Sequence, residues 1–182
     1  VLQLDSNPSE YDDVYTGKMV IKNGNPEFKV TTDVPIRFFP HKDNKLEGAI
    51  EIFKLPQKNK QGKVFACRYI AGNDPYDDDA SQTTSLGSTF ILDLWTDTIV
   101  AEYTGRPLFA NDYYEQVRLL LLYYNARLNY ENNKKGLFAY FQRMNCSYLL
   151  TDTLEFLKDR DSNGKDSYGN KQKGTNASKP IN

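Results

Sequence analysis

The stretch that most constrains the fold is a short apolar run that ends abruptly in polar and acidic residues. Residues 64–71 are almost all apolar, and Gly72-Asn73-Asp74-Pro75 follows them directly. Because apolar side chains occupy both parities of the run, it predicts a central strand that is covered on both faces. A carboxylate delivered to the end of a central strand is well placed to hold a metal ion. We therefore expect the rest of the chain to be arranged around Asp74.

Length and composition are compatible with one domain and a packed core, because the 182 residues are 39% hydrophobic and 13% aromatic. The formal net charge of -1 gives no support to a protein that finds DNA by its own positive charge, but it allows a nuclease that receives DNA from a partner. Cys67 and Cys146 form no CxxC pair, which indicates reduced thiols in an intracellular setting and no zinc site. We find no signal peptide and no membrane-spanning run, and the start at Val1 leads us to expect a piece of a longer protein.

The N-terminal part of the chain predicts only short β-strands. We interpret residues 1–34 as a linker or approach segment, within which a turn signal at residues 23–26 separates two β-rich runs. Residues 46–53 alternate between apolar and polar side chains and stop before Pro56, which predicts an edge strand.

Two further β-rich runs and a helix follow the acidic stretch. Residues 88–95 and 98–103 are separated by Thr96-Asp97, which predicts a tight antiparallel connection. Asp112 and Glu115 have the spacing of a capping box, and apolar residues at helical spacing then predict a helix over residues 112–125.

The last part of the predicted domain contains a strand that ends in a second carboxylate. Residues 126–130 predict a short strand, and Glu131 follows it. Helices are predicted over residues 137–144 and 153–158, and the polar residues 161–179 are interpreted as a loop. If the strand at 126–130 is parallel to the strand before Asp74 and lies beside it, the Asp74 and Glu131 carboxylates emerge at the same edge of the sheet.

Several short motifs along residues 35–182 occur in the order of a known family. They are Gly72-Asn73-Asp74-Pro75, Gly87, Val100-Ala101-Glu102-Tyr103, Gly105-Arg106, Tyr124-Asn125-Ala126, Glu131-Asn132-Asn133 with Gly136, and the segment from Gly174-Thr175-Asn176 to Lys179. Together these motifs resemble the nuclease domain of the large terminase subunit of tailed bacteriophages, a member of the ribonuclease H-like superfamily. No GxxxxGK[ST] motif of a packaging ATPase occurs in the chain.

The resemblance implies a fold, an activity and a setting. The fold is α/β: a mixed sheet of three antiparallel strands and a parallel fourth, flanked by helices, over residues 35–182. The implied activity is a metal-dependent endonuclease that cuts concatemeric double-stranded DNA during viral genome packaging. Its partners are a packaging ATPase domain and a portal protein, and its location is the cytoplasm of an infected bacterium, with no membrane involved. The family's third carboxylate, on a later helix, is not found before Asn182, so we expect the domain to be incomplete at its C-terminal end.

The chemistry of phosphodiester hydrolysis explains why acidic residues stand at these positions. Two divalent ions about 3.5–4 Å apart can activate water, neutralise the phosphate and stabilise the leaving oxygen. Mg²⁺ and Mn²⁺ prefer carboxylate oxygens, and the resemblance implies that Asp74 bridges two such ions and that Glu131 holds one. Asn132 and Asn133 are candidates to orient Glu131 or a phosphate. Possible extra ligands are Asp77, Asp78 and Asp79, and candidate DNA-phosphate contacts are Arg106, Lys134, Lys135, Lys171 and Lys173.

The sequence is compatible with three further interpretations. The segment Asp159-Arg160-Asp161-Ser162-Asn163-Gly164 matches the first half of an EF-hand calcium loop, but the twelfth position is Asn170 instead of Glu. A non-catalytic interaction domain of the same fold is the second interpretation, and a junction-resolvase type of nuclease is the third. We expect His41 to lie on the surface, and Trp95 and the tyrosines to lie in the core or on the sheet surface.

Overall fold

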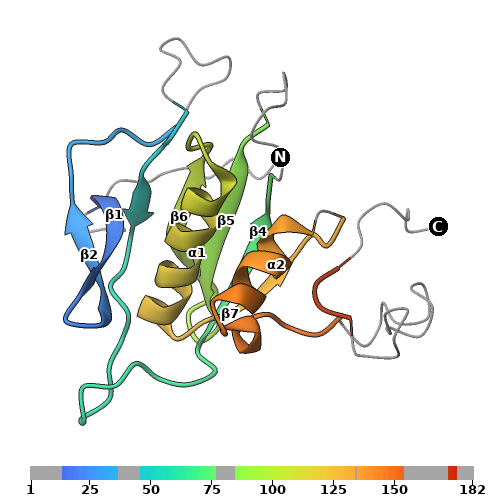
Figure 1. The fold of residues 1–182 in the computed structure, drawn as a ribbon. Helices are drawn as coiled ribbons and strands as arrows, with labels where there is room; N and C mark the ends of the chain where they lie inside the picture. Colours follow the sequence, from blue (N-terminus) through green and yellow to red (C-terminus); the bar gives the residue numbers. More distant parts are fainter. Residues whose placement is uncertain (1–13, 37–45, 77–84, 134, 154–171, 176–182) are drawn as a thin grey trace.

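The computed structural model describes residues 14–36, 46–76, 85–133, 135–153 and 172–175. This part of the chain folds into a mixed α/β structure, a seven-stranded sheet with two α-helices (Figure 1). The sheet order is β2-β1-β3-β6-β5-β4-β7, and all neighbouring strands are antiparallel except β4 and β7. In chain order the strands are β1 (Tyr15–Lys22), β2 (Asn25–Val30), β3 (Ile50–Ile52), β4 (Tyr69–Asp74), β5 (Gly87–Asp93), β6 (Thr98–Gly105) and β7 (Arg127–Tyr130).

Several sequence predictions fall outside the described residues. These are the surface position of His41, the acidic loop Asp77, Asp78 and Asp79, the cations Lys134 and Lys171, the calcium-like segment 159–170, and all but Thr153 of the helix predicted at 153–158.

The second half of the sheet confirms the predicted strand directions. β4 is antiparallel to β5, and β5 is antiparallel to β6. The chain then enters α1 (Ala110–Tyr124) and returns as β7, which pairs in parallel with β4. A parallel neighbour requires a crossover connection, which the helix provides. The predicted placement of Asp74 and Glu131 at one edge of the sheet depends on this parallel pair.

The N-terminal hairpin corrects two predictions. Residues 15–30 lie within the segment that we interpreted as a linker, but they form β1 and β2 of the same sheet. Asn23 and Gly24 supply the two positive-φ positions, +51° and +77°, that a tight hairpin turn requires. β1 also pairs with β3, and β3 pairs with β6. The strand predicted at the edge is therefore an interior strand, because the hairpin covers its outer side.

β4 differs from the strand predicted at residues 64–71. It begins only at Tyr69, because Cys67 has a φ of +57° that is incompatible with extended backbone, and it continues to Asp74. Its burial alternates strictly: the side chains of Tyr69, Ala71 and Asn73 are buried, and the residues between them are exposed. Both helices lie on one face of the sheet (Figure 1). The predicted coverage of both faces is therefore wrong for the described part of the chain.

The two helices agree with the predicted positions, but α1 does not begin with a capping box. Its N-cap is Phe109, which makes no side-chain capping hydrogen bond, and Asp112 lies in the first turn. Glu115 instead accepts two hydrogen bonds of 2.7 Å from Arg118. α2 (Gly136–Arg143) is followed by a 3₁₀ turn, η2 (Ser147–Leu149). None of the helices in the described ranges has the length and apolar character needed to cross a membrane.

Buried tyrosines dominate the core between the sheet and the helices, as predicted for these residues. The buried members are Tyr69, Tyr76, Tyr103, Tyr113, Tyr114, Tyr124, Tyr130 and Tyr140. Their hydroxyl groups make hydrogen bonds to neighbouring parts of the chain. For example, Tyr124 donates to the carbonyl of Lys54 (2.6 Å) and Tyr114 donates to the carbonyl of Tyr76 (2.7 Å). Buried phenols need such partners. Trp95 is 60% exposed in the β5–β6 turn and packs on the guanidinium of Arg68, 4.5 Å from its ring centre.

Candidate metal centre at the ends of β4 and β7

The register of the parallel pair brings the two predicted carboxylates together. Ala71 pairs with Leu128, and Asn73 pairs with Tyr130. The next residues along the two strands are Asp74 and Glu131. The amide of Glu131 donates to the carbonyl of Asn73 at 3.0 Å, so the ladder continues to the base of both carboxylates. Neighbouring strands lie about 4.8 Å apart, which places the two residues side by side at the end of the sheet.

The alternation of burial tells on which face these side chains lie. Asn73 and Tyr130 are buried, on the side of the helices. Because successive side chains along a strand point to opposite faces, Asp74 and Glu131 both project from the face away from the helices. Asp74 is exposed and Glu131 is half-buried. We call this side, with Gly72, Asp74 and Glu131, the open face.

A buried hydrogen-bond network supports the strand end beneath Asp74. The Asn73 amide nitrogen lies within hydrogen-bond distance of the Thr89 hydroxyl (2.7 Å), the Tyr113 hydroxyl (2.7 Å) and the Ser88 carbonyl (3.1 Å), which share its two hydrogens. Thr89 and Tyr113 also bond to each other at 2.9 Å. Burial raises the pKa of Tyr113 well above its usual range, so the phenol remains protonated. The network links β4, β5 and α1 and holds the backbone that carries Asp74.

Polar side chains extend from Asp74 across the open face. Ser88 is opposite Asp74 in the β4–β5 register, and its hydroxyl lies 2.9 Å from that of Thr104 on β6. Thr104 in turn donates to Glu102 at 3.0 Å. On the other side, the Asn133 amide donates to the Glu131 carboxylate. Asn133 thus orients Glu131 as expected, whereas Asn132 turns away and donates to the Lys173 carbonyl (2.6 Å).

The donor set fits a hard divalent cation. Two carboxylates from adjacent strand ends offer oxygen ligands, and water can complete an octahedral shell. In the part of the chain that the structure describes, no group of three or more His, Cys, Asp or Glu side chains is close enough to hold a metal ion. The described residues therefore offer two candidate ligands at this position, Asp74 and Glu131.

The predicted DNA-binding cations that the structure describes are engaged within the protein. Arg106 donates to the Ser85 carbonyl (2.7 Å) and lies over the ring of Tyr76. Lys135 donates to Asn132. The Lys173 ammonium is 2.6 Å from the Asp152 carboxylate, which neutralises its charge locally. Arg106 and Lys135 flank the site, whereas Lys173 contributes to the fold around it.

A segment from the end of the chain lies against β7 and was missed by the sequence prediction, which assigned it to a loop. Residues 172–175, which we call the strap, lie beside the end of β7, where Thr175 forms a parallel bridge with Glu131. The Thr175 amide donates to the Tyr130 carbonyl (2.8 Å), and the Asn132 amide donates to the Thr175 carbonyl (2.7 Å). The signal in the sequence was the motif at Gly174-Thr175, which the resemblance had picked out without a structural role.

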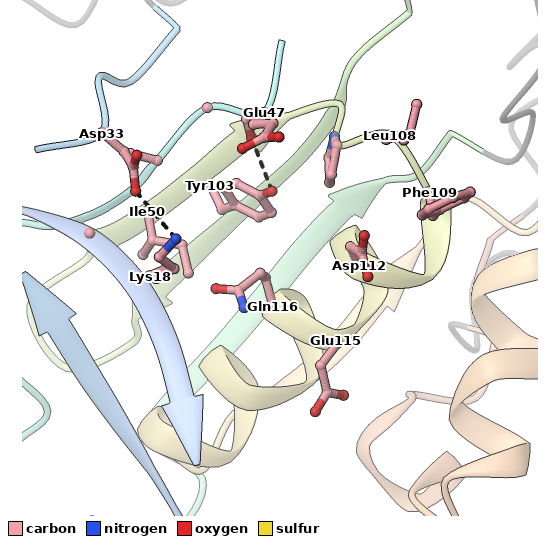
Figure 2. Close-up of a pocket in the computed structure, with 14 residues that line it drawn as sticks. Lys18, Asp33, Glu47, Ile50, Tyr103, Leu108, Phe109, Asp112, Glu115 and Gln116 are labelled. Atoms are coloured by element: carbon pink, nitrogen blue, oxygen red, sulfur yellow. Dashed lines mark hydrogen bonds and ion pairs between the residues drawn. The ribbon is translucent and has the colours of Figure 1, made fainter. Parts of the chain in front are cut away.

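A pocket lies on the helix side of the sheet, and neither Asp74 nor Glu131 lines it. It has a volume of about 470 Å³ and lies between β1, β3, β6 and the first turns of α1 (Figure 2). Four acidic residues and one lysine line it: Asp33, Glu47, Asp112, Glu115 and Lys18. The Glu115 carboxylate is bound by Arg118 and Tyr140, so among the described residues Glu47 and Asp112 supply the unpaired negative charge. Lys18 and Asp33 form an ion pair at 3.7 Å. The remaining negative charge disfavours DNA there, and none of the predicted site residues lines the pocket.

No model of a known protein family matches the chain, and a search of curated proteins finds no match. The candidate site consequently depends on the residues and the geometry described above.

Proposed function

We propose that this protein is a divalent-metal-dependent endonuclease that cuts double-stranded DNA, of the type found in viral packaging terminases. The observation that carries the proposal is the placement of Asp74 and Glu131 at adjacent ends of two parallel strands, on the same open face. Carboxylates in this arrangement are the usual oxygen ligands of Mg²⁺ and Mn²⁺ in phosphodiester hydrolysis.

The strand connections support assignment to the ribonuclease H-like fold. Within the larger sheet, the four strands β6-β5-β4-β7 are neighbours in that order, with α1 between β6 and β7. Three antiparallel strands, a helix and a parallel fourth strand are what the resemblance implies. In this interpretation the hairpin β1–β2 and strand β3 are additions that extend the sheet beyond β6, outside the four strands of the ribonuclease H-like arrangement.

The roles that we propose for the chain's own residues follow from their positions. Asp74 and Glu131 would hold a Mg²⁺ or Mn²⁺ ion, which when bound would activate a water molecule and neutralise the phosphate. Asn133 holds the Glu131 carboxylate in position. The Asn73–Thr89–Tyr113 network fixes the strand end, so that Asp74 needs little rearrangement to bind.

Delivery of DNA by a partner fits the charge of the protein. The net charge of -1 gives little affinity for phosphates, because such affinity comes from cations that release counterions. A packaging ATPase domain and a portal protein, in the cytoplasm of an infected bacterium, are the partners that the proposal implies. Tethering to a DNA-bound motor raises the local substrate concentration without new contacts.

A plasmid-nicking assay in Mn²⁺ tests the proposal. We expect slow conversion of supercoiled DNA by the wild type and at least about a 100-fold loss in Asp74→Asn and in Glu131→Gln, because each removes a metal ligand. Glu102→Gln is the matched control, since it neutralises a carboxylate on the same face two strands away from Asp74. Equal activity in all four proteins, or preference for a four-way junction over plasmid DNA, would contradict the assignment.

Metal titration is the complementary measurement. Two protein ligands should hold one ion weakly, and Mn²⁺ should bind more tightly than Mg²⁺, following the general affinity order of divalent metals. Calorimetry should show one weakly bound ion per chain, and Asp74→Asn should abolish this binding. Tight binding of two ions, or binding that is indifferent to Asp74, would contradict the site.

A further inference from the structure

We propose that the strap, residues 172–175, is a positioning element for Glu131, and that Gly174 is the residue on which it depends. This inference rests on the proposed function, because a positioning role for the strap matters only if Glu131 binds a metal ion. The strap contacts the site through backbone and not through a charged side chain.

Glu131 is held between two backbone neighbours. On one side its amide donates to the Asn73 carbonyl of β4 at 3.0 Å. On the other side Thr175 makes hydrogen bonds to the residues before and after Glu131, at 2.8 Å to Tyr130 and 2.7 Å from Asn132. Without the strap, β7 would be an edge strand with free backbone groups just where it delivers the carboxylate. With the strap in place, the end of β7 has backbone hydrogen-bond partners on both sides, β4 and the strap.

The strap is itself fastened to the segment after η2. The Gly174 amide donates to the Thr151 carbonyl at 3.1 Å. The Thr153 hydroxyl donates to the carbonyls of Gln172 (3.1 Å) and Gly174 (2.9 Å). The Thr175 hydroxyl donates to Asn129, on β7 (3.1 Å). These bonds lie on both sides of Gly174 and keep the strap against β7.

Only glycine fits at position 174, for two separate reasons. Its φ is +73°, a conformation that other residues adopt at a cost. A Cβ there would also lie 2.6 Å from the Tyr130 carbonyl oxygen and 2.7 Å from the Tyr130 ring. Because β7 backbone is the obstacle, the strap and not the strand must move. Tyr130 directly precedes Glu131, so the displacement occurs at the base of the carboxylate.

The chain offers a matched control for the test. Gly24 has a φ of +77°, almost the same as Gly174, but a Cβ there would meet nothing within 4 Å. Gly24→Ala therefore introduces the same backbone strain without the clash, at the far end of the sheet. A milder variant, Thr153→Val, keeps the side-chain shape and removes only the two hydroxyl bonds to the strap.

The experiment measures Mn²⁺ affinity by calorimetry and hydrogen exchange of the Asn132 amide, which donates to Thr175, in the wild type and these variants. We expect Gly174→Ala to weaken Mn²⁺ binding about 10- to 100-fold, the effect usual for residues that orient a metal ligand. Thr153→Val should weaken it about 2- to 10-fold, as expected for lost hydrogen bonds. Both should speed Asn132 exchange, and Gly24→Ala should change neither quantity.

Asp74→Ala separates the two proposals. If it abolishes Mn²⁺ binding while Gly174→Ala and Thr153→Val bind as the wild type does, the strap inference is overturned and the proposed function stands. If the wild type binds no Mn²⁺, the proposed function fails and the metal role of the strap fails with it. If Gly174→Ala does not fold, Thr153→Val decides between the two results.

Discussion

On the helix-covered face of the sheet, Asp93 is 2% exposed and its carboxylate receives hydrogen bonds of 2.6–3.0 Å from the guanidinium of Arg68. On the open face, Asp74 is exposed, and its carboxylate has no hydrogen bond or ion pair with the described residues. The two aspartates lie at opposite ends of the same strand pair, β4 and β5. One carboxylate is satisfied by the fold, and the other is left available for a ligand.

The comparison extends beyond these two residues. The covered face is filled by tyrosines whose hydroxyls bond to backbone carbonyls or to neighbouring side chains, so its polar groups serve the packing. The open face carries Asp74, Ser88, Thr104 and Glu131 along one row of the sheet. An exposed carboxylate that makes no hydrogen bond or ion pair within the described residues, such as that of Asp74, is a candidate for binding or catalysis. Changes on the covered face should therefore alter stability, and changes at Asp74 or Glu131 on the open face should alter activity.

The largest expected difference is between Asp93→Ala and Asp74→Ala. Asp93→Ala leaves the Arg68 guanidinium, whose side chain is 12% exposed, without its partner and should reduce the free energy of unfolding by about 3–5 kcal/mol. Asp74→Ala should leave the free energy of unfolding within about 0.5 kcal/mol of the wild type and abolish Mn²⁺-dependent nicking. Urea denaturation and the nicking assay measure the two effects. A large loss of stability in Asp74→Ala would break the distinction between the faces.

The pH dependence of stability sharpens the same comparison. Burial alone would raise the pKa of Asp93, but the hydrogen bonds from Arg68 and the Trp95 amide, with the guanidinium charge, hold it below its usual value. A lowered pKa in the folded state stabilises the protein above the unfolded value of about 3.9, and this stabilisation is lost as the pH falls through the folded pKa. In Asp93→Asn, the urea concentration at the denaturation midpoint should depend less on pH between pH 5 and pH 2 than it does in the wild type. An unchanged acid dependence would show that other carboxylates cause it.

The next largest difference in stability is expected between alanine substitutions of one glycine on each face, Gly87 and Gly72. A Cβ at Gly87, on the covered face, would lie 2.5 Å from the ring of Tyr113, whereas a Cβ at Gly72, on the open face, meets nothing within 4 Å. Gly87→Ala should cost about 1–3 kcal/mol, as overpacking usually does. Gly72→Ala should be neutral or stabilise by up to about 1 kcal/mol, because neither position has a positive φ. Thermal unfolding of both variants measures the difference. Equal destabilisation would mean that the open face at Gly72 is packed against other residues, as the covered face is.

The network beneath Asp74 connects the two faces. Tyr113→Phe removes the hydroxyl that bonds to Asn73 and Thr89, in a site with no exposure to water. We expect a loss of about 1–2 kcal/mol in stability, and a smaller loss of nicking than in Asp74→Asn, because the strand end is loosened while the ligand remains. Thr89→Val is the control that removes a hydroxyl from the same network. Unchanged stability in both variants would show that the network does not hold the strand end.

The sequence was sufficient to predict the parts of this arrangement that depend on local pattern. The β-rich runs around residues 88–103 and the helical spacing that follows predicted the strand directions, and these placed Asp74 beside Glu131. The exposed face of β4 could not be predicted in this way. An apolar run indicates that its residues can be buried, but it does not show which other elements of the fold cover them. The interior position of β3 depends on the hairpin at residues 15–30, whose pairing is non-local.

The strap shows the same limit at the candidate site. Residues 172–175 are polar, which is typical of a loop, and the contacts that fix them are to the backbone of β7 and to Thr151 and Thr153. Hydrogen bonds between distant backbone groups leave no periodic signal in the sequence. Gly174 was recognisable as part of a motif, but its role follows only from the φ of +73° and the position of Tyr130.

The smallest expected effect concerns the acidic pocket on the helix side. Glu47 and Asp112 line it, and neither forms an ion pair with the described residues. Because the pocket lies on the helix side of the sheet, the double variant Glu47→Gln with Asp112→Asn should change the nicking rate less than twofold at 0.1 M salt, where the screening length is about 10 Å. At 0.01 M salt, where screening reaches about 30 Å, the loss of two negative charges should raise the rate modestly, since DNA is repelled less.

Glu102→Gln is the reference variant for that measurement, because it removes one charge from the open face itself. Its effect on the salt dependence of nicking should exceed that of the pocket double variant, although it removes fewer charges. Position relative to the open face, and not the total charge, would then determine how DNA approaches Asp74 and Glu131. A loss of nicking in the pocket variant as large as that in Glu131→Gln would place the reacting DNA on the helix side and reverse the assignment of the two faces.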